Sequence, residues 1–198
     1  LALTNKIEYT LVNVDNDGFV NPDDVFNLLQ DNTALVTIMH SNNEIGTLQP
    51  IQEISKKIQI FNENLISRGL TRSPVLFHSD GAQSVGKVWV DVQSLNVDLF
   101  TIVGHKYGAP KGIAALYIRD GISLQPLLFG GGQENGRRAG TENILLTVAL
   151  GEASRIALVE FHDLVIHLLD LRFFLVSLLR ETFKDTIRFN GPNKAYDL

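Results

Sequence analysis

The stretch VDLFTIVGHKYGAPK, Val97–Lys111, joins a short apolar run to a glycine-rich turn. The apolar run, Leu99–Val103, predicts a buried strand, and His105 and Lys106 follow at its carboxyl end. If strand and turn together exclude water from the Lys106 ammonium group, desolvation favours the neutral amine, which is a nucleophile. The alternative to a nucleophilic lysine is an ordinary surface lysine that ends the strand and points into water. The local pattern alone favours that alternative.

Strand and helix patterns alternate on both sides of this stretch. Continuous apolar runs are typical of strands buried on both faces of a parallel sheet, and one-sided apolar repeats are typical of the helices that cover it. Strands are expected at residues 7–14, 34–39, 75–78, 99–103, 112–119 and 187–189, and helices after an Asn21 cap, at 50–61 and, with a break, from 144 to about 182. This order predicts an α/β fold whose mostly parallel mixed sheet is flanked by helices.

Polar residues follow three of the predicted strands. Asn43 lies after the strand at 34–39, Asp80 and Gln83 lie after the next, and His105 and Lys106 lie after the third. Parallel sheets bind ligands beyond the carboxyl ends of their strands, so we expect these side chains to meet at one edge. Their convergence favours a reactive lysine over a surface lysine.

Composition excludes several classes of protein. The chain has 198 residues and a net charge of −5, which argues against a nucleic-acid-binding protein. No segment reaches the run of about 18 apolar residues that a membrane span needs, and with no visible signal sequence we expect a cytoplasmic location. The chain contains no cysteine, and its five histidines show no metal-ligand spacing, so no metal site is expected.

A long glycine-rich loop, GGGQENGRRAGT, occupies residues 130–141 and carries two arginines. Glycines let a backbone approach a ligand closely, and arginines beside a helix start suit a phosphate or carboxylate. A flexible surface loop explains the same residues equally well. The helix that follows is expected to begin within Thr141–Asn143.

Four ordered motifs resemble the pyridoxal-phosphate enzymes of aminotransferase class V, and most closely their cysteine desulfurase and selenocysteine lyase branch. These motifs are HSNNEIG at 40–46, FHSDGAQSVGK at 77–87, GHKYGAPKG at 104–112 and GGGQENGRRAGTEN at 130–143. The resemblance implies an aminotransferase-like large domain with pyridoxal 5'-phosphate as cofactor. The wording of the third and fourth motifs, and the polar segment 62–74, look more like selenocysteine lyase than like the housekeeping desulfurases.

The resemblance also implies a role for individual residues. Lys106 would form the covalent link to the cofactor and move protons at the substrate, and Asp80 would pair with the pyridinium nitrogen. Gln83 would bind the ring phenolate, Asn43 would lie near the cofactor and the substrate carboxylate, and His105 would bind the cofactor phosphate. Thr141 would reach the cofactor phosphate of the partner subunit, and Arg138 is a motif residue of less defined role. For Asn43 the alternative is an Asx turn.

The family's further parts divide the chain into three. Residues 1–150 correspond to the cofactor-binding large domain without its N-terminal part, 151–185 to long connecting helices, and 186–198 to the start of a truncated C-terminal small domain. The first reading of function is a selenocysteine lyase that converts L-selenocysteine to alanine and reduced selenium. The alternatives are a cysteine desulfurase supplying sulfur for iron–sulfur clusters, and a silent truncated product without the active-site cysteine. A homodimer and an acceptor protein for selenium or sulfur are the expected partners.

Overall fold

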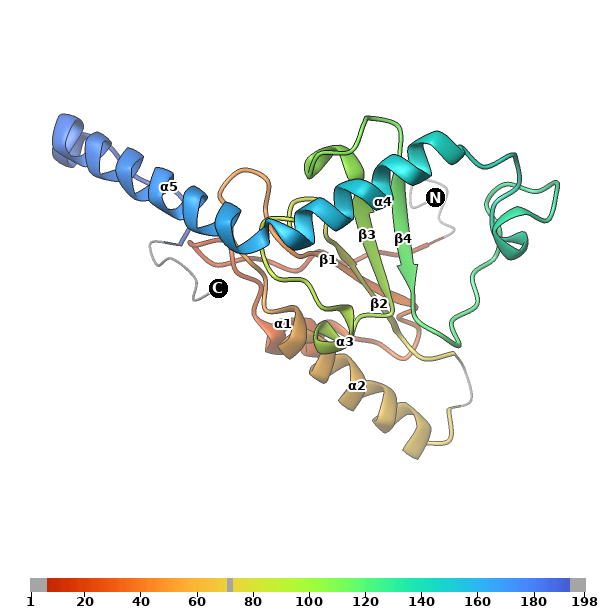
Figure 1. Ribbon diagram of the computed structural model, residues 1–198. Coiled ribbons are helices and arrows are strands. Elements are labelled where there is room, and N and C mark those ends of the chain that lie inside the picture. Colours follow the sequence, from red (N-terminus) through yellow and green to blue (C-terminus); the bar gives the residue numbers. More distant parts are fainter. Residues whose placement is uncertain (1–6, 71–72, 193–198) are drawn as a thin grey trace.

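The computed structural model describes residues 7–70 and 73–192 and contains a four-stranded sheet in the order β1-β2-β3-β4. The strands are β1 (Leu35–Met39), β2 (Leu76–Asp80), β3 (Leu99–Val103) and β4 (Ala114–Ile118). The first three run parallel, whereas β4 pairs antiparallel with β3. The predicted α/β class and the mostly parallel mixed sheet are therefore confirmed (Figure 1).

One face of the sheet is covered by α1 (Pro22–Leu28), α2 (Ile51–Ser67) and α3 (Val92–Leu95), as Figure 1 shows. Asn21 caps α1 as predicted, because its side chain accepts a hydrogen bond from the Asp23 amide. Alternate strand residues face these helices and form the core with them. The fully buried members of this core are Val25, Ile51, Ile54, Val75, Phe77, Val97 and Phe100.

Helix α2 is longer than its apolar repeat predicts. It continues past Phe61 to Ser67, through a polar segment that the sequence left as an undefined connection. Asn62 lies within this extension and makes two hydrogen bonds with the Val75 backbone, donating to its carbonyl at 3.0 Å and accepting from its amide at 2.8 Å. This contact ties the helix to the start of β2 without any apolar side chain, so hydrophobic periodicity could not reveal it.

Two further helices follow the sheet, α4 (Ile144–Val159) and α5 (Phe161–Phe183). The predicted break is confirmed at Glu160, which separates them. Helix α4 passes close to the turn after β3, where a Cβ on Gly104 would lie 2.9 Å from Leu150, and α5 extends beyond the sheet (Figure 1). Within residues 7–70 and 73–192, no helix combines the length and the apolar character required to cross a bilayer.

Two predicted strands are wrong. Residues 7–14 run along the surface, where Tyr9 and Leu11 are 71% and 77% exposed. Among the described residues, their pairing is limited to an isolated bridge between Val14 and Val20. Residues 187–189 follow a short 3-10 turn, Lys184–Thr186, and have no strand partner in the part of the chain that the structure describes. Residues 7–14 have the β-branched composition of a strand and residues 187–189 alternate apolar and polar, but a strand also needs a neighbour to accept its hydrogen bonds.

Candidate active site

Three loops leave the sheet at the carboxyl ends of β1, β2 and β3. Strand register places Met39 beside Asp80 and Asp80 beside Thr101. The main chain continues this alignment, since the His40 amide donates to the Asp80 carbonyl at 2.8 Å and the Gly81 amide donates to the Thr101 carbonyl at 3.0 Å. The three predicted polar clusters therefore start at one edge of the sheet, as the parallel topology requires.

Asp80 is the last residue of β2 and is half-buried. One carboxylate oxygen accepts a hydrogen bond from the Ala82 amide at 2.9 Å, which fixes the turn that follows. Asp80 shares its sheet face with His78, because residues two apart on a strand point the same way. The Asp80 carboxylate therefore lies at the carboxyl edge of the sheet and is oriented by the turn that follows β2.

His78 connects three strands through its imidazole ring. Its Nδ1 lies 2.7 Å from the Thr37 hydroxyl and its Nε2 lies 2.9 Å from the Thr101 hydroxyl. Burial lowers the pKa of His78, and the Asp80 carboxylate opposes that shift. Both ring nitrogens are engaged, so this histidine orders the face beside Asp80.

The turn after β2 brings Gln83 next to Lys87. The Lys87 ammonium donates to the Gln83 side-chain carbonyl at 3.2 Å. Beneath them, the buried hydroxyls of Ser84 and Ser41 share a short hydrogen bond that joins this turn to the loop after β1. Lys87 was not singled out from the sequence, although its spacing of four residues from Gln83 is a signal for contact within a helical turn.

Lys106 ends a 3-10 turn, Gly104–Lys106, directly after β3. Lys106 and His105 are both exposed, so the predicted partial desolvation of the lysine is wrong. The turn carries them outward while Gly104, at its base, is buried. The positive charge of Lys106 nevertheless acts on its surroundings: after burial, it is the second cause that lowers the pKa of Lys87. The two amines therefore belong to one cluster.

His40, at the end of β1, is a buried histidine with a structural role. It is 3% exposed, and its ring packs edge-on against Phe100 with 6.0 Å between the centroids. Its Nδ1 has no hydrogen-bond partner within the described residues, and burial lowers the pKa of His40 to about 4. The ring is therefore neutral at pH 7 and behaves as part of the core.

The remaining predicted residues lie farther out. The side chain of Asn42, and not that of Asn43, forms the Asx turn by accepting hydrogen bonds from the Glu44 and Ile45 amides, and Asn43 is exposed. Thr141 is exposed on the glycine-rich loop, which projects beyond the edge strand β4 in Figure 1.

The predicted cap within 141–143 is Asn143, whose side chain accepts from the Leu146 amide at 3.1 Å. Arg138 donates to the Ala139 carbonyl at 2.7 Å. The loops that carry Asp80, Gln83 and Lys106 thus begin at one sheet edge, whereas the glycine-rich loop lies beyond β4.

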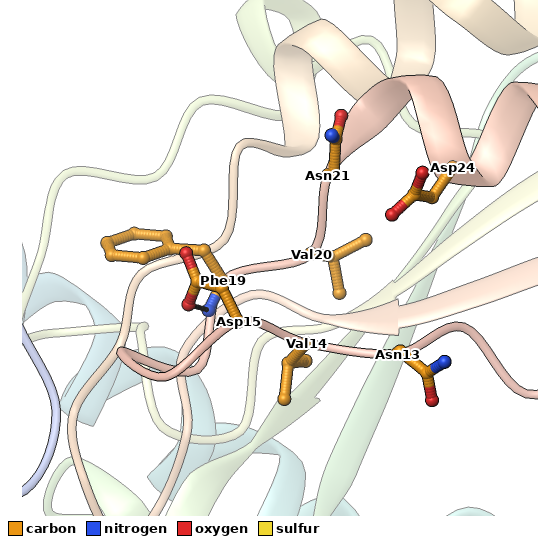
Figure 2. A pocket seen from close by; sticks show the side chains of 7 residues that line it. All are labelled: Asn13, Val14, Asp15, Phe19, Val20, Asn21 and Asp24. Carbon is orange, nitrogen blue, oxygen red and sulfur yellow. Dashed lines mark hydrogen bonds between the residues drawn. The ribbon is translucent and has the colours of Figure 1, made fainter.

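A separate cavity of about 440 Å³ lies near the start of the chain (Figure 2). Its lining residues are Asn13, Val14, Asp15, Phe19, Val20, Asn21 and Asp24, and none of them is a predicted site residue. Asp15 is committed to its own turn, since its carboxylate accepts from the Asp17 and Phe19 amides at 2.9 Å each. The cavity has no chemical connection with the edge that carries Lys106.

Known proteins share both the sequence and the fold of this chain. The family model "Aminotransferase class-V" matches residues 1–196. The cysteine desulfurase IscS of Dictyoglomus turgidum is 41% identical over 185 residues, which are 93% of this chain and 44% of that protein. The cysteine desulfurase IscS of Methanosarcina thermophila is 46% identical over 170 residues, 86% of this chain and 39% of that protein.

A solved structure described as a NifS-like protein superposes with a TM-score of 0.82 at 34% identity, covering 90% of this chain and 46% of that one. This match confirms the predicted aminotransferase-like fold. The chain spans less than half the length of these relatives. Sequence and fold agree, and the chain belongs to the aminotransferase class-V family, in its cysteine desulfurase and NifS-like branch.

Proposed function

We propose that the complete protein is a pyridoxal-phosphate-dependent cysteine desulfurase, which converts L-cysteine to L-alanine and passes the sulfur to an acceptor. The observation that carries the proposal is the grouping of Asp80, Gln83 and Lys106 at the carboxyl edge of three parallel strands, in a chain matched along residues 1–196 by the family model. The relatives described above are named cysteine desulfurases. They favour the alternative of the sequence analysis over its first reading, a selenocysteine lyase.

The side chains at this edge fit the cofactor chemically. A primary amine suits its aldehyde carbon, a carboxylate suits a protonated pyridine nitrogen, and an amide nitrogen suits a phenolate oxygen. Lys106, Asp80 and Gln83 supply these three groups, and His105 adds an imidazole for the phosphate. When bound, pyridoxal phosphate supplies an electron sink for bond breaking at the substrate Cα.

The chain's own residues then perform binding and proton transfer. The Lys106 Nζ takes the proton from the substrate Cα and holds it for return to the product. The Asp80 carboxylate would pair with the ring nitrogen, in an orientation fixed by the Ala82 amide. Asn43, on the exposed loop after β1, would bind the substrate carboxylate. The chain contains no cysteine, so none of its residues is assigned the sulfur-accepting role.

Partners belong to the same proposal. We infer a homodimer in which Thr141 reaches the cofactor phosphate of the partner subunit, because the loop that carries it projects away from the Lys106 turn (Figure 1). Sedimentation equilibrium of the chain tests this: a monomer at all concentrations would contradict it. A sulfur-acceptor protein completes the proposed set.

The decisive experiment is the absorption spectrum of the purified chain with pyridoxal phosphate, before and after borohydride. We expect a yellow band that borohydride bleaches, with the cofactor then attached to Lys106 in a peptide digest. Lys106→Ala abolishes the band, whereas Lys111→Ala, at the next lysine and also exposed, retains it. A folded wild-type chain without the band, or a band that persists in Lys106→Ala, contradicts the proposal.

A further inference from the structure

The side chain of Lys87 contacts a residue of the proposed site without being part of the predicted set. Its ammonium lies 3.2 Å from Gln83 Oε1. An ammonium group has three donors and no acceptor, so it can bind only the carbonyl end of the amide. The contact therefore determines which end of Gln83 is occupied and leaves Nε2, the donor end, facing the other way.

The turn that carries both residues is held in place from two sides. Ser84, between them, is fully buried and is hydrogen bonded to Ser41. Gly86 has a φ of +77°, and a Cβ built on it would lie 2.9 Å from the Tyr107 Cβ. The backbone of this turn thus packs directly against the residue that follows Lys106, which explains why Lys87 and Lys106 are close enough to interact.

We propose that Lys87 is a positioning residue, which holds Gln83 Oε1 so that Gln83 Nε2 presents its hydrogen to the phenolate oxygen of pyridoxal phosphate. The inference rests on the proposed function, since it assigns a purpose to an orientation at that site. Lys87 itself is half-buried, and its burial, followed by the charge of Lys106, lowers its pKa, which indicates that its amine lies inside the cluster and not free in solvent.

The first test needs no cofactor. In the ¹⁵N-labelled full chain, the side-chain amide signals of Gln83 are assigned from their loss in Gln83→Glu. We expect Lys87→Met to shift and broaden them, while Lys87→Arg, which keeps a cationic donor, restores signals close to those of the wild type. Lys111→Met is the matched control and leaves them unchanged. Unaltered Gln83 signals in a folded Lys87→Met chain overturn the proposal.

The second test measures the affinity for pyridoxal phosphate from the absorption band. Loss of one hydrogen bond to a charged group should weaken binding by about tenfold in Lys87→Met and in Gln83→Met. If Lys87 acts through Gln83, the double variant is no weaker than Gln83→Met alone. If the double variant binds pyridoxal phosphate more weakly, by the product of the two single losses in affinity, the positioning role of Lys87 is overturned. A wild-type chain without any band overturns the proposed function and this role together. A wild-type band with independent losses in the variants overturns only the role of Lys87, so the two failures are distinguishable.

Discussion

Helices α2 and α5 both carry many apolar side chains, but their surroundings are opposite. Helix α2 has 17 residues and buries five of them, Ile51, Ile54, Ser55, Ile58 and Leu65. Helix α5 has 23 residues and buries only Val165. Its other apolar side chains remain accessible, and Phe174 is 68% exposed. In Figure 1, α2 lies under the sheet whereas α5 extends beyond it.

The difference shows what an apolar pattern predicts. In α2 the apolar residues form one stripe, and one stripe needs one partner, which β2 and β3 supply. In α5 they are distributed around the helix, so no single face of the sheet could cover them. A large exposed apolar surface is unusual for a monomeric protein and is typical of a surface used for contact. Within residues 7–70 and 73–192, stability is therefore concentrated in the sheet and in α1–α3.

The largest effect expected from this contrast is the loss of a core aromatic ring. Phe100 is completely buried, so Phe100→Ala should lower the free energy of unfolding by about 3–5 kcal/mol. Phe174→Ala removes the same ring from α5 and should change that free energy by less than about 0.5 kcal/mol. Urea titration followed by circular dichroism measures both. Equal losses would show that α5 is packed as tightly as the sheet.

The second effect is a dependence of stability on pH that originates at His40. Its folded-state pKa of about 4 lies below the ordinary histidine value of 6.5, which the unfolded chain retains. The unfolded chain therefore binds more protons between these values, and stability is complete above pH 6.5 and falls as the pH is lowered toward 4. The shift corresponds to about 3 kcal/mol, the cost of placing a charge on a ring packed against Phe100.

His40→Phe should flatten this part of the pH profile, as measured by unfolding at pH 7 and pH 4.5. His162→Phe, at an exposed position on α5, is the matched control and should leave the profile unchanged. A wild-type profile that is already flat between these pH values would show that His40 is accessible to protons in the folded chain.

The fold could be predicted from the sequence wherever one-sided or continuous apolar patterns meet a partner inside the chain. The runs at 34–39 and 99–103 became β1 and β3, and the residues after them gathered at one edge. The residues at 7–14 have a strand composition, but no strand within residues 7–70 and 73–192 pairs with them. Hydrophobic pattern reports what a segment can bury, while strand formation also depends on which backbone groups lie alongside.

The sheet edge that carries the candidate site residues could be predicted, whereas the surroundings of their side chains could not. Asp80 and Gln83 stand where the order of strands placed them, because chain topology alone determines which loops share an edge. The exposure of Lys106 and the contact between Lys87 and Gln83 depend on how two turns pack together. Local sequence does not encode that packing, since it is set by Gly86 lying against Tyr107.

The smallest expected effect comes from replacing two glycines, Gly81 beside the sheet core and Gly151 on the helices that follow the sheet. A Cβ on Gly81 would lie 2.1 Å from the Phe100 ring and 2.9 Å from the Thr101 carbonyl oxygen. Gly81→Ala should therefore lower the free energy of unfolding by about 1–3 kcal/mol.

In α4, by contrast, a Cβ on Gly151 meets nothing within 4 Å. Alanine is a better helix former there, so Gly151→Ala should raise the free energy of unfolding by up to about 1 kcal/mol. Thermal unfolding of the two variants beside the wild type gives the signs directly. Opposite signs are expected because the same methyl group enters a filled core at Gly81 and open solvent at Gly151. A loss of stability in Gly151→Ala would mean that α4 is covered by a surface that these contacts do not include.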